Sequence, residues 1–292
     1  MSKKQVTSGT KAKKTIVNII IHIFLAILSF IWVLPIFWVV LTSFRGEKGS
    51  YVTTFFPKTY TINNYVKLFT DTSIILNFPK MFVNTFIIAI FTCIISTIFV
   101  LSVSYTMSRM RFNMRKPFMN VAMILGLFPS FMSMIAVYYI LKALGLAEGS
   151  MIRIALIVVF SAGSGVGFYV AKGFFDTIPK ALDEAAIIDG ATRWQVFTKI
   201  TAPLSKPIIV YTILTSFMGP WVDFIFAKVI CRADAQYYTV SIGLWKMLEK
   251  EYIDSWYTCF AAGAVVVSIP IAILFLLTQK FYVDGMSGAV KG

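Results

Sequence analysis

Charged residues are scarce in this chain of 292 residues: they make up 14% of it, whereas apolar residues make up 58%. A soluble domain normally carries about a quarter charged residues. The mean hydropathy of +0.79 points the same way. The composition therefore excludes an ordinary soluble domain and predicts a multi-span membrane protein that shares its core with lipid.

Residues with catalytic or metal-binding chemistry are also few. The sequence has one histidine, His22, and thirteen acidic residues spread mainly over the expected loops. It contains no Walker-type phosphate loop, no HExxH and no GxSxG pattern. We expect no enzyme activity, no metal site and no cofactor bound by this chain. His22 lies alone in an apolar run, where a hydrogen-bonded packing residue is the simpler reading.

The cysteines and one run of small residues are explained by helix packing rather than by a chemical function. The cysteines Cys93, Cys231 and Cys259 fit no metal spacing and are predicted to be packing residues, with a bridge between the last two left open. The small-residue run from Ser161 to Gly167 resembles a phosphate loop but lacks the Gly-Lys-Ser/Thr ending. We expect it to pack helices closely through Gly163 and Gly167.

Lysine and arginine outnumber acidic residues by 27 to 13, which gives a net charge of +14. In a membrane protein such an excess marks cytoplasmic ends that face anionic lipid, so no nucleic-acid partner is expected. Residues 1–15 form a basic cytoplasmic tail. The turn at 108–116 has four cations and no acid, which places it inside as well.

The apolar runs predict six membrane spans with both termini in the cytoplasm. The spans are expected at 16–44, 81–107, 117–141, 151–175, 207–226 and 258–281. The first run is too long for a signal peptide and lacks a small-residue cleavage site. The predicted organisation is a six-span domain over 16–281 with an inner loop at 176–206, an outer loop at 227–257, and a cytoplasmic tail at 282–292.

The most informative segment is the polar stretch from Asp183 to Pro207. Helix formers at 181–188 predict one short helix, and Asp189-Gly190 then supplies a turn. Thr192 and Gln195 have the spacing of a capping box that begins a second helix.

The second helix has an apolar stripe formed by Trp194, Phe197 and Ile200, with charged and polar residues outside it. Pro203 and Pro207 are expected to end this helix and pass the chain to the fifth span. On pattern alone, an amphipathic helix resting on lipid headgroups remains an alternative.

The same segment resembles the cytoplasmic loop of ABC importer permeases. That pattern reads EAA, three residues, Gly, nine residues, Ile, two residues, Pro, and it is met here by Glu184-Ala185-Ala186, Gly190, Ile200 and Pro203. The family usually has Leu before the Pro, where this chain has Ala202. The flanking TIPKALDEAAIIDGAT is similar to the sugar-importer branch. The resemblance implies the all-α, six-helix fold of type I importer permeases.

The resemblance also implies partners. They are two ATPase subunits that bind ATP and Mg, a second and different permease, and an extracellular solute-binding protein. The residues expected to couple the spans to the ATPase are Glu184, Ala185, Ala186, Asp189, Gly190, Trp194, Phe197, Ile200 and Pro203. The ending GMSGAVKG is similar to the tail of maltose-type permeases that lies against the ATPase, which suggests Gly285, Gly288, Lys291 and Gly292. A frayed chain end is the alternative.

The substrate is less well specified. Asp223, an ionisable group near the outer end of the fifth span, and Trp221 beside it are candidates for the substrate path. Arg232, Asp234 and Tyr237 lie in a loop that resembles the segment reaching the binding protein. The expected function is a permease subunit that imports maltodextrin or another oligosaccharide by alternating access. The alternatives are an ABC permease for another solute and a stand-alone secondary transporter.

Overall fold

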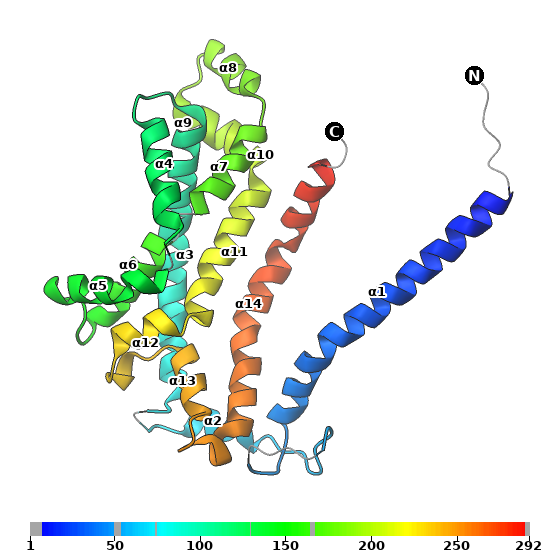
Figure 1. The fold of residues 1–292 in the computed structure, drawn as a ribbon, viewed down its shortest axis with the longest axis vertical. Helices are drawn as coiled ribbons and strands as arrows, with labels where there is room; N and C mark the ends of the chain where they lie inside the picture. The colour runs from blue at the N-terminus through cyan, green and yellow to red at the C-terminus, as the bar shows by residue number, and fades with distance from the viewer. Residues whose placement is uncertain (1–7, 50–53, 74, 129, 164–166, 290–292) are drawn as a thin grey trace.

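The computed structural model describes residues 8–49, 54–73, 75–128, 130–163 and 167–289. Over these ranges the chain is helical, and its β-structure is limited to one isolated bridge between Arg45 and Tyr60. Figure 1 shows the helices running mostly along one long axis. The prediction of an all-α protein is confirmed.

Three helices are long and apolar enough to cross a membrane unaided: α1 (Ser8–Ser43), α3 (Phe78–Arg109) and α14 (Ile253–Ala289). α3 lies at the centre and packs against α6, α7 and α11. α14 begins five residues before the predicted sixth span and continues beyond residue 281. The predicted tail at 282–292 is therefore, as far as Ala289, an extension of the last helix.

The remaining crossings are bent pairs. α4 (Arg115–Gly126) and α5 (Ser130–Ala143) meet at 104°, whereas α6 (Met151–Gly163) and α7 (Gly167–Thr177) meet at 43°. A third pair, Arg193–Leu204 and Lys206–Val222, meets at 82°, and counting each of the three pairs as one crossing brings the total over the described residues to six. The prediction of six crossings holds, but the third and fourth are not the single straight helices that hydropathy suggested.

The predicted outer loop at 227–257 is wrong as a loop. It contains α12 (Ile225–Cys231), a 3₁₀ turn η3 (Ala235–Tyr237) and α13 (Val240–Met247). Ile230, Ile242 and Met247 are almost fully buried and join the main core around Phe78 and Met81 of α3. Apolar burial, which contributes roughly 25 cal/mol per Å², draws this segment into the bundle.

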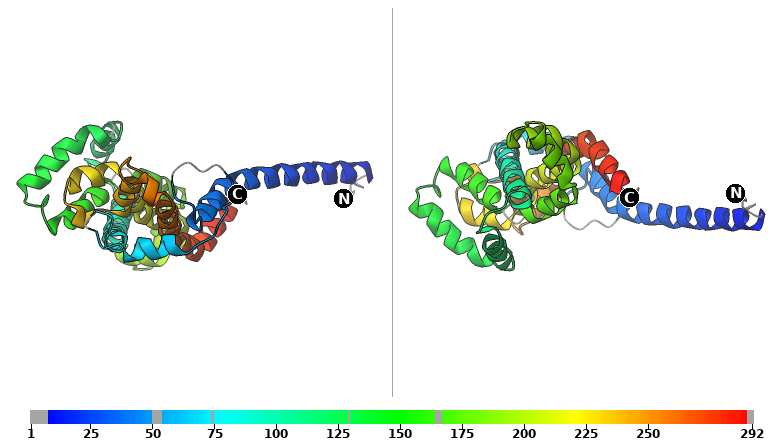
Figure 2. Two further views of the ribbon diagram at one scale, coloured as in Figure 1. Left: turned by 90° about the horizontal axis from the view of Figure 1, so that it is seen from below. Right: turned by 90° about the horizontal axis from the view of Figure 1, so that it is seen from above.

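The first helix stands apart from the bundle. Residues 14–37 are exposed along their whole length, and α1 packs against α14 near its outer end (Figures 1 and 2). His22 accordingly is not a packing residue in the isolated chain, although its Nδ1 lies 2.6 Å from the Asn18 carbonyl oxygen. The start of α1 and the end of α14 lie toward the same side as α8 (Lys180–Ile188), as an even number of crossings requires.

The outer end is closed by ordered polar contacts. α2 (Asn63–Thr70) packs on α14, and the buried Arg45 donates to the carbonyl oxygens of Thr54 and Phe55. The three cysteines are free, with Cys231 and Cys259 buried, so the prediction that they pack is confirmed and no disulfide joins them.

Candidate coupling segment and central cavity

The coupling segment, residues 176–206, starts at the end of α7 and contains α8 as its first complete helix, which is fixed to the end of α3 by an ion pair. Nε of Arg109 lies 3.2 Å from Oδ2 of Asp183, and both side chains are largely buried. Nη2 of Arg109 also donates to the carbonyl oxygen of Ile178 at 3.0 Å. One arginine of α3 therefore holds both α8 and the turn that precedes it.

The break between the two short helices has the predicted chemistry. Gly190 has a φ of +86°, a left-handed conformation that favours glycine. The capping box is complete, because Gln195 N donates to Thr192 Oγ1 at 3.3 Å and Thr192 N donates to Gln195 Oε1 at 2.8 Å. The turn and the start of the second helix are confirmed.

The second helix differs from a regular α-helix. It consists of α9 (Arg193–Val196), a π-turn η2 (Phe197–Thr201) and α10 (Ala202–Leu204). It meets α11 (Lys206–Val222) at 82°, with the break at Ser205 between the two prolines. The segment therefore lies across the end of the bundle rather than along it.

The predicted apolar stripe is divided by this geometry. Phe197 packs on Tyr105 of α3 with ring centroids 4.8 Å apart, whereas Trp194 is 71% exposed. The residue that anchors the helix is Val196, which is 1% exposed and was not in the predicted stripe. The π-turn breaks the 3.6-residue periodicity on which the stripe was based.

Several large apolar side chains of the coupling segment are exposed at the end of the bundle. Ile188 is 85% exposed, and this exposed set consists of Leu182, Ile187, Ile188, Trp194 and Leu204. Figure 1 shows α8 projecting beyond the ends of the neighbouring helices. Exposed apolar groups of this kind at a projecting site are typical of a contact with another protein.

Within this chain, the acidic residue that anchors α8 is Asp183 rather than its neighbour Glu184, which was expected to couple the spans to the ATPase. Glu184 is exposed and lines a cavity of about 400 Å³ that is rich in cations. Ala185 is exposed and Ala186 half-buried, so this chain alone does not use them for close packing. The cavity is lined by five basic residues, Arg109, Arg111, Arg115, Lys180 and Arg193, with Asp183 and Glu184.

Asp176, just beyond the predicted fourth span, joins the start of the segment to α3. Its Oδ1 accepts a hydrogen bond from Ser108 Oγ at 2.6 Å, and its Oδ2 pairs with Lys172.

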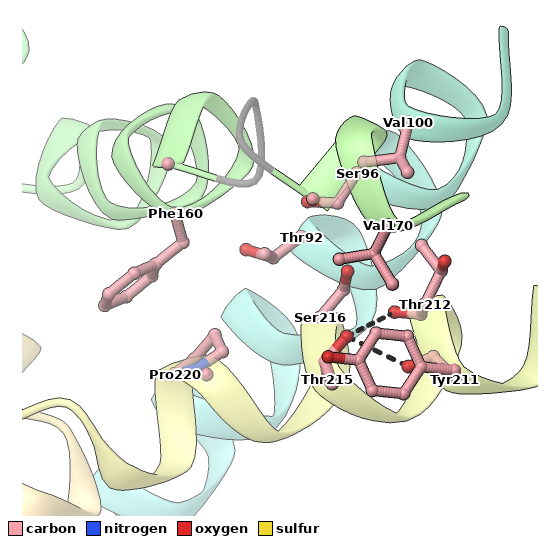
Figure 3. Close-up of a pocket in the computed structure, with 13 residues that line it drawn as sticks. Thr92, Ser96, Val100, Phe160, Val170, Tyr211, Thr212, Thr215, Ser216 and Pro220 are labelled. Atoms are coloured by element: carbon pink, nitrogen blue, oxygen red, sulfur yellow. Dashed lines mark hydrogen bonds between the residues drawn. The ribbon is translucent and has the colours of Figure 1, made fainter. Parts of the chain in front are cut away.

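A cavity of about 330 Å³ lies between α3, α6, α7 and α11 (Figure 3). Its lining is rich in hydroxyl groups: Thr92, Ser96, Tyr211, Thr212, Thr215 and Ser216. Gly163 and Gly167 also line it. A Cβ at Gly163 would meet nothing within 4 Å, so the predicted close packing is wrong there, whereas a Cβ at Gly167 would lie 3.8 Å from Val100 of α3. Residues 164–166 lie outside the described ranges.

The two predicted substrate-path residues occupy other places. Trp221 is 3% exposed and packs against Phe82 and Phe217 in the core. Oδ1 of Asp223 accepts a hydrogen bond from the backbone N of Ala227, in the first turn of α12, at 3.0 Å. The cavity is lined instead by Gly219 and Pro220, just before them.

The three residues predicted to reach a binding protein form an ordered outer segment. Arg232, with a φ of +48°, lies over the ring of Tyr138 at 4.4 Å. Asp234 accepts from Gln236 N and begins η3, while Tyr237 lies under the guanidinium of Arg153. Packing against α5 and α6 therefore fixes the conformation of this outer segment.

Asn84 of α3, which sequence reasoning did not single out, organises this outer segment. It donates to the carbonyl oxygens of Gln236 and Tyr238 at 2.9 and 3.1 Å and accepts from Arg153 Nε at 2.9 Å. A buried amide inside an apolar span was the available signal.

The predicted tail residues can be placed only in part. Gly285 and Gly288 belong to the last turns of α14. Lys291 and Gly292 lie outside the described residues.

Six apolar crossings, a polar cavity among them and a projecting coupling segment define a polytopic membrane transport protein. Residues 101–287 match the family described as binding-protein-dependent transport system inner membrane component. The chain belongs to this family and is an integral component of the cell membrane.

Relatives cover nearly the whole chain. It is 33% identical over 284 residues to the galactooligosaccharides transport system permease protein GanQ of Bacillus subtilis, covering 97% of this chain and 98% of the relative. It is 29% identical to the maltodextrin transport system permease protein MdxG of the same organism, covering 93% and 95%. The maltose/maltodextrin transport system permease protein MalG of Escherichia coli is 33% identical over 193 residues, covering 65% and 64%.

A solved structure shares the fold. It is a chain of a bacterial ABC transporter involved in the import of the acidic polysaccharide alginate, with a TM-score of 0.72 and 21% identity. The alignment covers 96% of this chain and all of that one. The six-helix arrangement of an ABC importer permease is thereby established for this chain.

Proposed function

We propose that this chain is a permease subunit of an ATP-driven importer that moves maltodextrin or another oligosaccharide into the cell by alternating access. The relatives that carry sugar-transport names align along the length of the chain, which supports a sugar as the solute. A second, different permease would complete the path, and an extracellular solute-binding protein would deliver the sugar.

The observation that carries the ATP-driven part of the proposal is the exposed apolar set on the coupling segment. Ile188 and Trp194 project where no lipid tail is expected, and each lacks burial within this chain. Short helices with such a surface insert into a groove of a partner. The partner we propose is an ATPase dimer, which would bind ATP and Mg.

The contacts of the segment give a path by which ATPase movement would reach the spans. α8 is tied to α3 through Asp183 and Arg109, and α9 is tied to α3 through Phe197 and Tyr105. α10 leads directly into α11. Because α3 and α11 both line the central cavity, displacement of the segment would move two of its walls as a rigid body.

Individual residues take the following proposed roles. Gly190 permits the turn between the two helices, and Ala185 and Ala186 allow an ATPase surface to approach closely. Glu184 contributes a polar contact to that partner. Gly285, Gly288, Lys291 and Gly292 would extend the contact from the end of α14.

The test is reconstitution of this chain with its partner permease, ATPase and binding protein in proteoliposomes. ATP-dependent uptake of labelled maltotriose is expected, with no ATP hydrolysis by this chain alone. Ile188→Asp should abolish co-purification of the ATPase, because it places a charge in an apolar groove. Leu144→Asp, at an exposed position of the outer link, serves as the matched control. ATPase capture that survives Ile188→Asp would contradict the docking site.

A further inference from the structure

The hydroxyl-lined cavity lies near the middle of α3, a helix long and apolar enough to cross a membrane. Thr92 and Ser96 are 14 and 18 residues beyond Phe78 in the 32-residue α3. At a rise of 1.5 Å per residue they stand about 21 and 27 Å along a helix of about 48 Å. A polar chamber at this depth is costly unless something uses it.

The hydroxyl groups form two facing stripes. Thr92 and Ser96 are one helical turn apart on α3, and Thr212 and Ser216 are one turn apart on α11. In Figure 3 the side chains of Thr92 and Ser96 extend from α3 toward the space bounded by Phe160, Ser216 and Pro220. The rest of the lining combines three glycines, at 163, 167 and 219, with larger side chains that include Phe160 and Val170.

The cavity-lining hydroxyl groups of the two helices differ in whether they have hydrogen-bond partners. Thr212 Oγ1 donates to the Ile208 carbonyl oxygen at 2.8 Å, and Thr215 Oγ1 donates to that of Tyr211 at 2.9 Å. Thr92 and Ser96 are 2% and 0% exposed, yet their hydroxyls have no hydrogen-bond partner among the described residues. A buried hydroxyl without a partner is unfavourable, so these two groups are available for a ligand.

The lining also defines the chemistry of that ligand. A hydroxyl both donates and accepts, which matches the hydroxyl groups of a sugar. Among the described residues no acidic or basic side chain lines the cavity, so a charged solute would find no counter-ion there. Its volume of about 330 Å³ is at the lower end of small-molecule sites, which suits a short part of a sugar chain.

We propose that Thr92 and Ser96, facing Ser216, form a subsite that binds the hydroxyl groups of an uncharged sugar unit as an oligosaccharide passes through this subunit. This rests on the proposed function and adds to it a site within this chain. The alternative occupant is water alone.

The test uses the complete importer in proteoliposomes, with uptake of labelled maltotriose and ATP hydrolysis measured together. Thr92→Val/Ser96→Ala removes both hydroxyls at nearly constant shape. Sugar carried per ATP should fall about tenfold, while hydrolysis stimulated by the loaded binding protein is kept. Thr92→Ser/Ser96→Thr retains both hydroxyls and should stay within about twofold of the wild type.

The matched control is Thr278→Val/Ser268→Ala on α14, where both hydroxyls are already bonded to backbone carbonyls. It should transport normally. Unchanged transport by the hydroxyl-free variant would mean that the cavity holds only water, and equal impairment of the swapped variant would mean that shape matters rather than hydroxyls. Either result overturns the subsite but leaves the proposed importer intact.

A second measurement on the wild-type importer needs no variant. A photoreactive trisaccharide trapped during turnover should label α3 between Thr92 and Val100. Labelling confined to the partner permease would overturn the subsite. A wild-type assembly that takes up no sugar would overturn the proposed function, and the subsite with it.

Discussion

At the scale of single residues, Asp183 and Glu184 show how helix geometry separates neighbouring side chains. Consecutive residues on an α-helix point about 100° apart. Asp183 therefore turns toward Arg109 and is buried, whereas Glu184 is exposed beside a cluster of cations. The EAA pattern begins at Glu184, but the acidic residue that holds α8 in this chain is Asp183.

Because only Asp183 is paired with Arg109, we expect the two amide substitutions to affect different properties. Asp183→Asn would leave Arg109 without its counter-charge, which costs about 3 kcal/mol for a buried pair. Hydrogen exchange of the α8 amides should then be roughly a hundredfold faster. Glu184→Gln should leave this exchange unchanged but weaken ATPase binding. Equal exchange in the two variants would show that the ion pair does not hold α8.

Gly190 permits a second prediction, because the obstacle to a side chain there is conformational rather than steric. A Cβ would meet nothing within 4 Å, but the φ of +86° costs a larger residue about 1–2 kcal/mol. Gly190→Ile should reduce uptake and its coupling to ATP hydrolysis strongly, while the protein remains inserted.

Gly145, in the outer link, provides a control for that strain. It has a φ of +71° and equally open space. Gly145→Ile should therefore carry a similar conformational cost without affecting coupling. Full uptake by Gly190→Ile, or equal uncoupling by both variants, would show that the turn at Gly190 has no specific role in coupling.

At the scale of elements, local chemistry was predictable and tertiary packing was not. The turn at Gly190 and the capping box at Thr192 depend on a few adjacent residues, so the sequence sufficed. The packing of Phe197 against Tyr105 of α3 is a contact between residues far apart in the chain, and the π-turn at Phe197–Thr201 departs from regular helix geometry. A periodicity argument assumes regular geometry and therefore missed them.

The outer segment was misassigned for a related reason. Arg232, Asp234 and Glu249 give residues 227–257 the composition of a solvent loop. α12 and α13 are each too short to register as spans, yet their apolar residues fill the core. Bends within the third and fourth crossings escaped hydropathy too, because a bent pair has the same apolar content as a straight helix.

Asn84 links the outer segment to α3, and its removal should loosen that element specifically. Asn84→Leu would leave two carbonyl oxygens and Arg153 Nε without this partner, at a cost of about 1–3 kcal/mol for each unsatisfied group. Hydrogen exchange over 236–240 should rise, and stimulation of ATP hydrolysis by the binding protein should fall.

Asn77→Ala, at the N-cap of the same helix, serves as the comparison. It should cost about 1 kcal/mol through loss of the cap but leave the exchange of 236–240 unaltered. If both substitutions loosened 236–240 equally, the effect would belong to α3 as a whole rather than to the Asn84 network.

At the scale of the whole molecule, the first crossing does not belong to the compact part of the fold. Residues 14–37 are exposed on every side, with Trp32 74% and Phe24 63% exposed, whereas α6, α7 and α11 pack on α3 and α14 packs on α11. A helix that is apolar all round is normally enclosed by lipid, protein or both. In membranes, close packing between helices rather than water exclusion holds such a helix in place.

The separation of α1 from its own bundle predicts that it packs against the proposed second permease. A benzoylphenylalanine at Trp32 should cross-link to that permease in the assembled importer and to lipid when this chain is expressed alone. The same probe at Phe78, a fully buried residue of the core, should yield only cross-links within the chain if it inserts at all. Labelling of lipid alone from Trp32 in an actively transporting assembly would show that α1 is a peripheral anchor. The assembly would then depend on the surfaces of α3, α7 and α11, and α1 could be removed without loss of the complex.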